Sequence, residues 1–200
     1  MKNILEKLLN GRDLSVDESY NLMVSIMSGD YDEAQISGLL IALRAKGEAV
    51  DEIIGFAKGM REKMITVPIS SSAIDMCGTG GDESGTFNIS TAASFVVAGA
   101  GVHVAKHGNR SMTSKSGSAD VLESLGIDIN LPLQKSAANI DKIGLGFLFA
   151  PSFHPAMKYA MPVRKSIACR TVFNILGPLS NPANVKAQAM GIFSPDLTEV

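Results

Sequence analysis

The sequence is poor in cysteine and has no excess of positive charge. Its only cysteines, Cys77 and Cys169, lie far apart, unlike the paired short spacings of a zinc site, and are too few for a disulfide framework. Eighteen Lys and Arg residues face 20 Asp and Glu residues, which gives a net charge of -2. This balance argues against a surface-wide basic field for nucleic acid or anionic lipid. We therefore expect a cytoplasmic protein whose phosphate recognition, if present, is local.

A long hydrophobic run is also missing. The most apolar stretch, residues 92–102, is about half the roughly 20 residues that span a bilayer, so we expect it to be a core segment. Residues 1–10 form an amphipathic stretch rather than a basic flank followed by an apolar run. We expect neither a membrane partner nor an export signal. With 46% apolar residues, a chain of 200 residues can bury a substantial core.

The first third of the chain has the period of amphipathic helices. Ser15 and Glu18 have the spacing of a capping box, in which each side chain binds the other residue's backbone amide. Apolar residues recur at helical spacing at Tyr20, Met23, Val24, Met27, Ile36, Leu39, Leu40 and Leu43, and Gly11, Gly29 and Gly47 are typical helix stops. Short connections leave consecutive helices as neighbours. We predict an antiparallel helical domain over residues 1–66.

After a serine-rich connector that contains Pro68, short apolar runs alternate with helical stretches. The predicted strands are residues 73–76, 102–105 and 147–150, and the predicted helices are residues 92–99, 119–125 and 133–142. The pattern predicts the α/β fold class, with a larger, mostly parallel α/β domain over residues 73–200. Such sheets bind ligands at the carboxyl ends of their strands, which directs attention to the loops after Met76 and Ala105.

The loop after the first predicted strand is rich in glycine and hydroxyl groups. Residues 78–82 read Gly-Thr-Gly-Gly-Asp, and residues 88–91, Asn-Ile-Ser-Thr, open an apolar helix. Glycines and a helix N-terminus bring amide hydrogens close to an anion, so a phosphate or pyrophosphate fits here. The loop matches neither a P-loop nor a dinucleotide fingerprint. A tight turn with Asn88 or Ser90 as helix cap is the alternative.

The loop after the second predicted strand is basic. Lys106, His107, Arg110 and Lys115 are interleaved with serines, Thr113 and glycines. Such a mixture suits charge-assisted hydrogen bonds to phosphate, and the alternative is a solvated basic turn. Its position after a strand favours phosphate binding.

Several motifs in order resemble the anthranilate phosphoribosyltransferase family. They are Gly-Thr-Gly-Gly-Asp at 78–82, Asn-Ile-Ser-Thr at 88–91, Lys-His-Gly-Asn-Arg at 106–110, Ser-Gly-Ser-Ala-Asp at 116–120, His-Pro-Ala-Met at 154–157, Pro-Val-Arg-Lys at 162–165 and Arg-Thr-Val-Phe-Asn-Ile-Leu-Gly-Pro-Leu at 170–179. The resemblance implies a small helical domain hinged to an α/β domain of the nucleoside phosphorylase/phosphoribosyltransferase type. It also implies a homodimer formed through the helical domain, and a magnesium-dependent (Mg2+) enzyme of tryptophan biosynthesis. That enzyme transfers phosphoribosyl from phosphoribosyl pyrophosphate (PRPP) to the amine of anthranilate, which yields N-(5-phosphoribosyl)anthranilate and pyrophosphate.

The resemblance also implies site residues. Those for PRPP are Gly78, Gly81, Asp82, Thr86, Asn88, Ile89, Ser90, Thr91, Lys106, His107, Gly108, Asn109, Arg110, Ser111, Met112, Thr113, Ser114 and Ser118. Anthranilate would be held by Gly78, Asn109 and Arg164, and Ser90 would ligate magnesium.

The chemistry of these residue types agrees with such roles. Lys106 and magnesium would stabilise the departing pyrophosphate, and the planar guanidinium of Arg164 would grip the anthranilate carboxylate. His107 is a candidate acceptor of the departing proton, although we favour a hydrogen-bonding role in its loop. Lys106, His107 and Arg164 are thus the catalytic candidates. His154 either lines the anthranilate channel or caps a helix, while His103 and Cys77 are expected to be structural.

Chains of the family extend well beyond 200 residues, and the acidic pair that its members use for a second magnesium lies past Val200. We therefore expect the 200-residue chain alone to bind PRPP weakly and to turn over little or not at all. Two alternatives stay open, a pyrimidine-nucleoside phosphorylase and a non-enzymatic nucleic-acid-binding relative of the same fold. Asn109 with Arg164 argues against the first, and the net charge of -2 argues against the second, so no nucleic-acid partner is expected.

Overall fold

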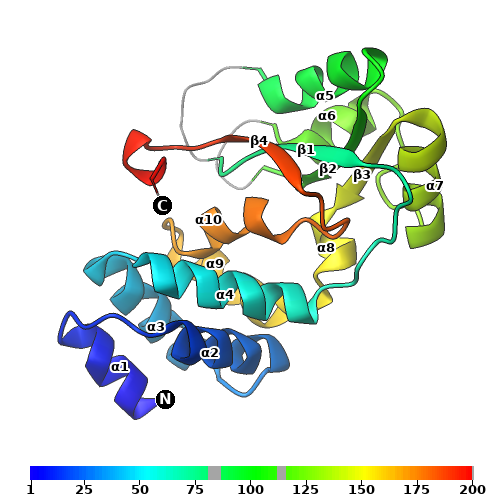
Figure 1. Ribbon diagram of the computed structural model, residues 1–200. Helices are drawn as coiled ribbons and strands as arrows, with labels where there is room; N and C mark the ends of the chain where they lie inside the picture. The colour runs from blue at the N-terminus through cyan, green and yellow to red at the C-terminus, as the bar shows by residue number, and fades with distance from the viewer. Residues whose placement is uncertain (81–86, 112–115, 200) are drawn as a thin grey trace. The chain divides into compact units, whose positions relative to one another are not determined.

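The computed structural model describes residues 1–80, 87–111 and 116–199. The chain forms two compact units (Figure 1). The helical unit contains Met1–Met64 and His154–Ser180, and the α/β unit contains Ile65–Phe153 and Asn181–Val200. The segment from 154 to 180 thus packs with the helices, although the sequence pattern placed it within the range 73–200. The domain boundaries 1–66 and 73–200 stay a prediction.

Capping and glycine geometry define the helices at the start of the helical unit. They are α1 (Lys2–Leu9), α2 (Val16–Ser28), α3 (Glu33–Lys46) and α4 (Val50–Lys63). The predicted capping box is confirmed: Ser15 Oγ accepts from Glu18 N, and the Glu18 side chain accepts from Ser15 N. Gly29 ends α2 in the left-handed conformation with φ of 83°, which a residue with a Cβ adopts less readily.

The short connections predicted that consecutive helices would be neighbours, but α2 packs mainly against α4 and α1 against α3. Helices α2 and α4 pack closely because α4 carries glycines where they meet. A Cβ at Gly55 would lie 2.3 Å from Val16 O, and a Cβ at Gly59 would lie 2.8 Å from Met23 Cβ. A methyl group at either position would collide with α2, so glycine at both positions lets the backbones of the two helices approach closely. The absence of side chains at these positions of α4 therefore sets the distance between the two helices.

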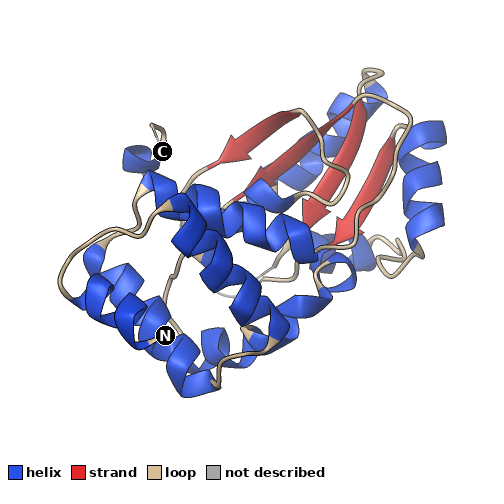
Figure 2. Cartoon of the chain, turned by 60° about the horizontal axis from the view of Figure 1, so that its bottom comes forward, coloured by secondary structure: helices blue, strands red, loops and turns tan. Residues whose placement is uncertain are grey.

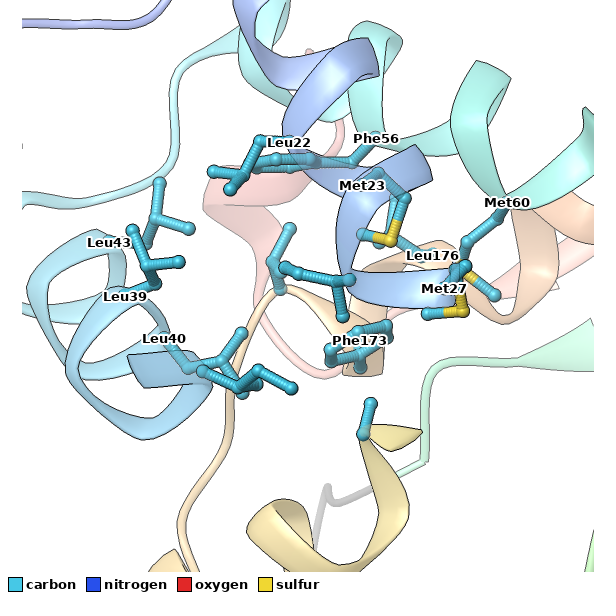
Figure 3. Close-up of a cluster of buried hydrophobic side chains, with 14 of the residues drawn as sticks. Leu22, Met23, Met27, Leu39, Leu40, Leu43, Phe56, Met60, Phe173 and Leu176 are labelled. Carbon is cyan, nitrogen blue, oxygen red and sulfur yellow. The ribbon is translucent and has the colours of Figure 1, made fainter. Parts of the chain in front are cut away.

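The second segment of the helical unit completes its core. It contains η1 (Pro155–Tyr159), α9 (Met161–Ile167), α10 (Phe173–Leu176) and η2 (Pro178–Ser180). Figure 3 shows Phe173 and Leu176 in one cluster with apolar side chains of α2, α3 and α4. Leu176 is fully buried. The first four helices therefore depend on residues more than 100 positions later in the chain for part of their core.

The α/β unit is built on a parallel sheet of order β3-β2-β1-β4, whose strands Figure 2 draws as red arrows. The strands are β1 (Ala73–Gly78), β2 (His103–Gly108), β3 (Leu145–Phe149) and β4 (Ala187–Gly191). The first three contain or overlap the predicted strands, whereas β4 was not predicted. The predicted fold class, a helical domain with a parallel-sheet α/β domain, is confirmed.

Helices cover both faces of this sheet. They are α5 (Ile89–Gly99), α6 (Ser118–Ser124) and α7 (Leu133–Ile143), with the short α8 (Ala150–Phe153) and η3 (Pro195–Leu197) outside the main layers. Gly146 of β3 faces α7, since its Cβ would lie 2.5 Å from Ile140 Cγ1. Phe147, one residue later, points to the opposite face, where Gly108 meets Phe147 and Ser118. Helices α5 and α6 lie on that face. No helix in the described part of the chain is long and apolar enough to cross a membrane.

Candidate functional site

The candidate site lies in the α/β unit where β1 and β2 end. The residue pairs between these strands are Ala73↔His103 and Ile74↔Val104, whereas β1 pairs with β4 as far as Gly78↔Gly191. Beyond Ile74, side chains bind the backbone groups between β1 and β2. Lys106 Nζ donates to Met76 O, and Asp75 Oδ1 accepts from His107 N at 3.0 Å. The two strands thus separate toward their carboxyl ends, and polar side chains fill the seam.

Lys106 is a buried cation beside this seam. The residue is 2% exposed, and Nζ lies 3.3 Å from Ser90 Oγ in the first turn of α5. Burial lowers the pKa of Lys106, and the negative charge of Asp75 opposes that shift. Asp75 is itself fully buried, which raises its pKa, while bonds from Asn181 and His107 oppose that shift.

The glycine loop is fastened to the end of β4. Thr79 N donates to Gly191 O at 2.9 Å, and Phe193 N donates to Thr79 Oγ1 at 3.1 Å. Gly80 has a φ of 65°, so the chain turns there in the left-handed region that favours glycine. Gly78 is exposed at the strand end. The order of strands reverses at β1, and the crevice at such a reversal is where open parallel sheets bind ligands.

The first turn of α5 presents amide groups that no side chain caps in the described structure. Asn88 occupies the N-cap position, but its Nδ2 donates across to Ser116 O at 3.0 Å. Thr91 Oγ1 donates to Ser118 Oγ at 3.0 Å. These two bonds join α5 to the start of α6. Ile89 N donates to Phe87 O, and among the described residues no side chain caps the amides of Ser90 and Thr91. The alternative role of Asn88 or Ser90 as side-chain cap is therefore not what the geometry shows.

Asp120 in the first turn of α6 ties the two ends of the basic loop together. Its Oδ2 accepts from Gly117 N at 2.7 Å and from Ser111 N at 3.2 Å. These bonds lower the pKa of Asp120, with the Gly117 amide as the largest cause. A Cβ at Gly117 would lie 2.3 Å from Ser111 N, so only glycine fits there.

Arg110 points toward α6 in this structure. Its guanidinium pairs with Glu123 and lies 3.2 Å from Asp120 Oδ1, and it stacks 5.8 Å from the Phe149 ring centroid. Arg110 would have to leave these carboxylates to contact a phosphate. Asn109 is exposed, with Oδ1 accepting from Arg110 N.

Arg164, in contrast, belongs to the helical unit, on α9. Nη1 lies 3.8 Å from Met161 Sδ, and the guanidinium carbon lies 5.3 Å from the Phe173 ring centroid. Burial lowers its pKa. No carboxylate forms an ion pair with Arg164 within the described part of the helical unit. A partly buried cation with apolar and sulfur neighbours is a good receptor for an anion.

The histidines and Cys77 differ in their surroundings. His154 is buried, with Nε2 3.0 Å from Ser180 O, and burial lowers its pKa to about 4. His107 follows Lys106 in the strand, so its ring points to the other face of the sheet, away from Ser90. Burial and the charge of Asp75 raise the pKa of the Cys77 thiol to about 12, which agrees with a structural role. His103 is partly buried at the start of β2.

The structure brings together all of the described residues that the sequence assigned to PRPP. Gly78, Asn88 to Thr91, Lys106 to Ser111 and Ser118 all lie at the carboxyl ends of β1 and β2 or on the helices that follow them. Six of the predicted site residues lie outside the described residues: Gly81, Asp82, Thr86, Met112, Thr113 and Ser114. The binding roles of the whole set stay predictions. Sequence reasoning missed Asp75, Asn181 and Gln188, although an aspartate within the apolar strand β1 was a usable signal.

The described residues offer few ligands for a metal ion. No group of three or more His, Cys, Asp and Glu side chains is arranged to hold one in the described ranges. Ser90 presents a hydroxyl beside the Lys106 ammonium, which is a weak donor set by itself. Mg2+ characteristically keeps few protein ligands and is bound largely through substrate phosphates. Ser90 therefore fits magnesium as one ligand to an ion that a diphosphate carries.

Comparison with known proteins gives the family. Residues 2–64 match the helical bundle domain of a glycosyl transferase family, and residues 70–200 match its a/b domain. The anthranilate phosphoribosyltransferase of Persephonella marina is 54% identical over 201 residues, which cover 100% of this chain and 59% of that protein.

Solved structures agree with these matches. Anthranilate phosphoribosyltransferase from Thermus thermophilus superposes with a TM-score of 0.91 at 44% identity, covering 96% of this chain and 59% of that one. The enzyme from Saccharomyces cerevisiae in complex with PRPP and Mg superposes with a TM-score of 0.90 at 30% identity, covering 99% of this chain and 60% of that one. The chain thus spans about 60% of the length of these relatives. It belongs to the glycosyl transferase family whose members combine a helical bundle domain with an a/b domain, and it is similar to the anthranilate phosphoribosyltransferases of that family.

Proposed function

We propose that this chain is part of an anthranilate phosphoribosyltransferase, which transfers phosphoribosyl from PRPP to the amine of anthranilate in tryptophan biosynthesis. The observation that carries the proposal is the buried ammonium of Lys106, which faces the uncapped first turn of α5 at the carboxyl end of the sheet. A buried cation beside free helix amides is a receptor for a multiply charged phosphate. The sequence similarity to anthranilate phosphoribosyltransferases supports the choice of substrates.

The groups around β1 and β2 suit the departure of pyrophosphate. As the bond to the anomeric carbon breaks, negative charge grows on the diphosphate and positive charge grows on the ribose. Lys106 and the α5 amides are fixed before the reaction, so they stabilise the growing negative charge without reorganising. Magnesium, when bound between the diphosphate and Ser90, would neutralise further charge on the leaving group. Magnesium dependence is part of the same proposal.

Arg164 suits the second substrate. Anthranilate carries a carboxylate and a weakly basic aromatic amine, and the planar guanidinium of Arg164 can bind the carboxylate through two parallel hydrogen bonds. The buried Phe173 ring packs against the Arg164 guanidinium and helps to fix its orientation. Once held, the amine needs orientation toward the anomeric carbon more than it needs a strong base. His107 is a weaker candidate for the base because its ring points away from Ser90 and Lys106.

The proposal extends to assembly and location. Leu9 of α1 and Ile41 of α3 are 66% and 44% exposed, and such apolar residues on packed helices support a homodimer through the helical unit. Light scattering of the purified protein tests this arrangement. A cytoplasmic location agrees with two cysteines that are both free thiols, Cys77 buried and Cys169 exposed.

The decisive experiment follows anthranilate fluorescence with PRPP and magnesium, using the protein at the full length that its gene encodes and the 200-residue chain in parallel. Arg164→Ala should raise the KM for anthranilate by roughly 10–100-fold, because a charge-assisted bond of about 1.5–3 kcal/mol is lost. Lys165→Ala, which removes the exposed neighbouring charge, is the matched control and should change KM less than about twofold.

Two outcomes would contradict the proposal. The first is a full-length protein that consumes no anthranilate but cleaves thymidine with inorganic phosphate, which would identify a nucleoside phosphorylase. The second is an equal effect of Arg164→Ala and Lys165→Ala on anthranilate KM, which would remove Arg164 from the anthranilate site.

A further inference from the structure

Asp75 has a chemical environment that the proposed catalytic groups do not explain. It is 0% exposed in the middle of β1, a strand whose other residues are apolar or glycine. Burying a carboxylate is costly unless several donors compensate it. Here Oδ1 accepts from His107 N at 3.0 Å and Oδ2 accepts from Gln188 Nε2 at 3.2 Å. Three neighbouring strands, β1, β2 and β4, therefore meet at this one carboxylate.

The seam between β1 and β2 shows what this carboxylate does. Strand β2 pairs with β3 through Gly108↔Phe149, and β1 pairs with β4 through Gly78↔Gly191, but the β1–β2 pairs end at Ile74↔Val104. A regular ladder would continue with backbone-to-backbone bonds across this seam. Instead, side chains bind the backbone groups of the seam. Asp75 accepts from His107 N, Lys106 Nζ donates to Met76 O, and Asn181 Nδ2 donates to Ala105 O at 2.8 Å.

We propose that Asp75 is a positioning residue, which holds β2 away from β1 at side-chain length and thereby places Lys106 for the diphosphate of PRPP. This inference rests on the proposed function. Asp75 binds the backbone amide of His107, the residue directly after Lys106, so it fixes strand β2 next to the point from which the lysine side chain extends. Gln188 of β4 fixes the carboxylate from the other side. Asp75 acts through Lys106 and His107 and is not itself a ligand of substrate.

The charges around the seam fit this role. Asp75 interacts electrostatically with Lys106 and with the Cys77 thiol, and the remaining neighbours, Asn181 and Gln188, are neutral amides. The negative charge of Asp75 thus interacts with the positive charge of Lys106, and neutral donors bind the carboxylate oxygens. An asparagine at position 75 would keep the shape and an acceptor for His107 N. It would, however, remove the negative charge that interacts with Lys106, and Gln188 would have to rotate its amide to accept from the new NH2 group, which gives up its bond to Cys77 Sγ.

The test compares Asp75→Asn with Asp141→Asn in the full-length protein. Asp141 is the matched control, because its carboxylate also binds two backbone amides, Ser70 N and Ser71 N, but it lies on α7 near the amino end of β1 and not at the carboxyl ends of the strands. Steady-state kinetics should give a rise of roughly 10-fold or more in the PRPP KM for Asp75→Asn, with the anthranilate KM changed less than about twofold. Asp141→Asn should leave both KM values within about twofold, even where it lowers the unfolding midpoint.

A second substitution distinguishes an effect on the placement of Lys106 from a general loss of stability. In Asp75→Asn with Gln188→Glu, the carboxylate moves to position 188 and accepts from the asparagine, which restores the negative charge at the seam. The PRPP KM should return to within roughly threefold of the parent. Gln188→Ala removes the donor that orients the Asp75 carboxylate, together with its contact to Cys77 Sγ, and should raise the PRPP KM by about threefold. This single variant decides the question if Asp75→Asn does not fold.

The outcomes distinguish this inference from the proposed function. The positioning role would be overturned if the parent protein is active and Asp75→Asn leaves the PRPP KM unchanged or raises both KM values equally. Where Asp75→Asn does not fold, the same two results for Gln188→Ala would overturn it. A parent protein without transferase activity would instead refute the proposed function. In that case, calorimetry with inorganic pyrophosphate and Mg2+ replaces kinetics. Weaker pyrophosphate binding by Asp75→Asn but not by Asp141→Asn would still support the positioning role, and equal binding would refute it.

Discussion

The buried His154 makes the stability of the helical unit depend on pH. The residue is 6% exposed, Nε2 lies 3.0 Å from Ser180 O, and burial lowers its pKa from 6.5 to about 4. A carbonyl oxygen only accepts hydrogen bonds, so Nε2 carries a proton and the neutral ring donates it. Protonation of the second nitrogen would place a positive charge in this buried site. We expect acid to destabilise the unit through this residue.

The sign and size follow from proton linkage. The unfolded state binds a proton near pH 6.5, whereas the folded state resists binding until about pH 4. The contribution of His154 to stability is therefore fully present above pH 6.5, falls as pH drops through this window, and reaches its limit below about pH 4. A pKa difference of this size corresponds to a loss of about 3 kcal/mol in the free energy of unfolding. That is a large part of the roughly 5–15 kcal/mol that is typical of a native domain.

Urea unfolding at several pH values between 7 and 4 measures this loss, with His154→Gln as the comparison. The three tyrosines, Tyr20, Tyr31 and Tyr159, all belong to the helical unit and there is no tryptophan, so tyrosine fluorescence reports on that unit. Glutamine can still donate to Ser180 O but does not titrate. The stability of the parent should fall by about 3 kcal/mol more than that of the variant across this range. Parallel pH curves for the two proteins would refute the buried, neutral state of His154.

Two further predictions concern packing and buried charge in the helical unit. Gly55→Ala should destabilise by about 1–3 kcal/mol because its methyl would collide with Val16 O. Gly38→Ala should stabilise by up to about 1 kcal/mol, since nothing lies within 4 Å of its Cβ and alanine favours helix; thermal unfolding that ranks the two alike would contradict this reasoning. Glu52→Ala should lower the free energy of unfolding in urea by about 3–5 kcal/mol, because Glu52 is fully buried and its carboxylate binds Lys46 Nζ and the amides of Leu14 and Ala49. Lys7→Ala, which breaks a partly exposed pair with Glu18, should cost less than about 1 kcal/mol, and equal losses would show that burial is not what matters.

Local chemistry explains which parts of the fold the sequence predicted. The capping box at Ser15 and Glu18 and the helix stop at Gly29 depend on residues within a few positions of each other, and both formed as expected. The predicted order of strand and helix is confirmed, with α5 after β1 and α6 after β2. The predicted strand ends were too early: Gly78 belongs to β1, and Lys106 and His107 belong to β2 rather than to the loop after it. The amphipathic periods in the first 64 residues likewise predicted helices, because each apolar stripe is a local pattern.

Other features depend on contacts that no local pattern reveals. Strand β4 has the sequence Ala-Gln-Ala-Met-Gly, which has little β-propensity, and it forms because it pairs with β1. The return of residues 154–180 to the helical unit depends on packing of Phe173 and Leu176 against helices more than 100 positions earlier. The seam at Asp75 requires knowledge of which strands are neighbours, and that order is known only once the topology is known.

The split of the helical unit has a consequence for how the protein is made. On the ribosome, α1 to α4 emerge first, but Phe173 and Leu176, which complete their core, emerge only after the whole of residues 65–153 has been synthesised. The apolar faces of the first helices thus wait, uncovered, while the sheet is still being translated. A nascent chain in that condition is a substrate for chaperones and is prone to associate with other chains. Translation speed between residues 65 and 180 therefore governs how long this vulnerable state lasts.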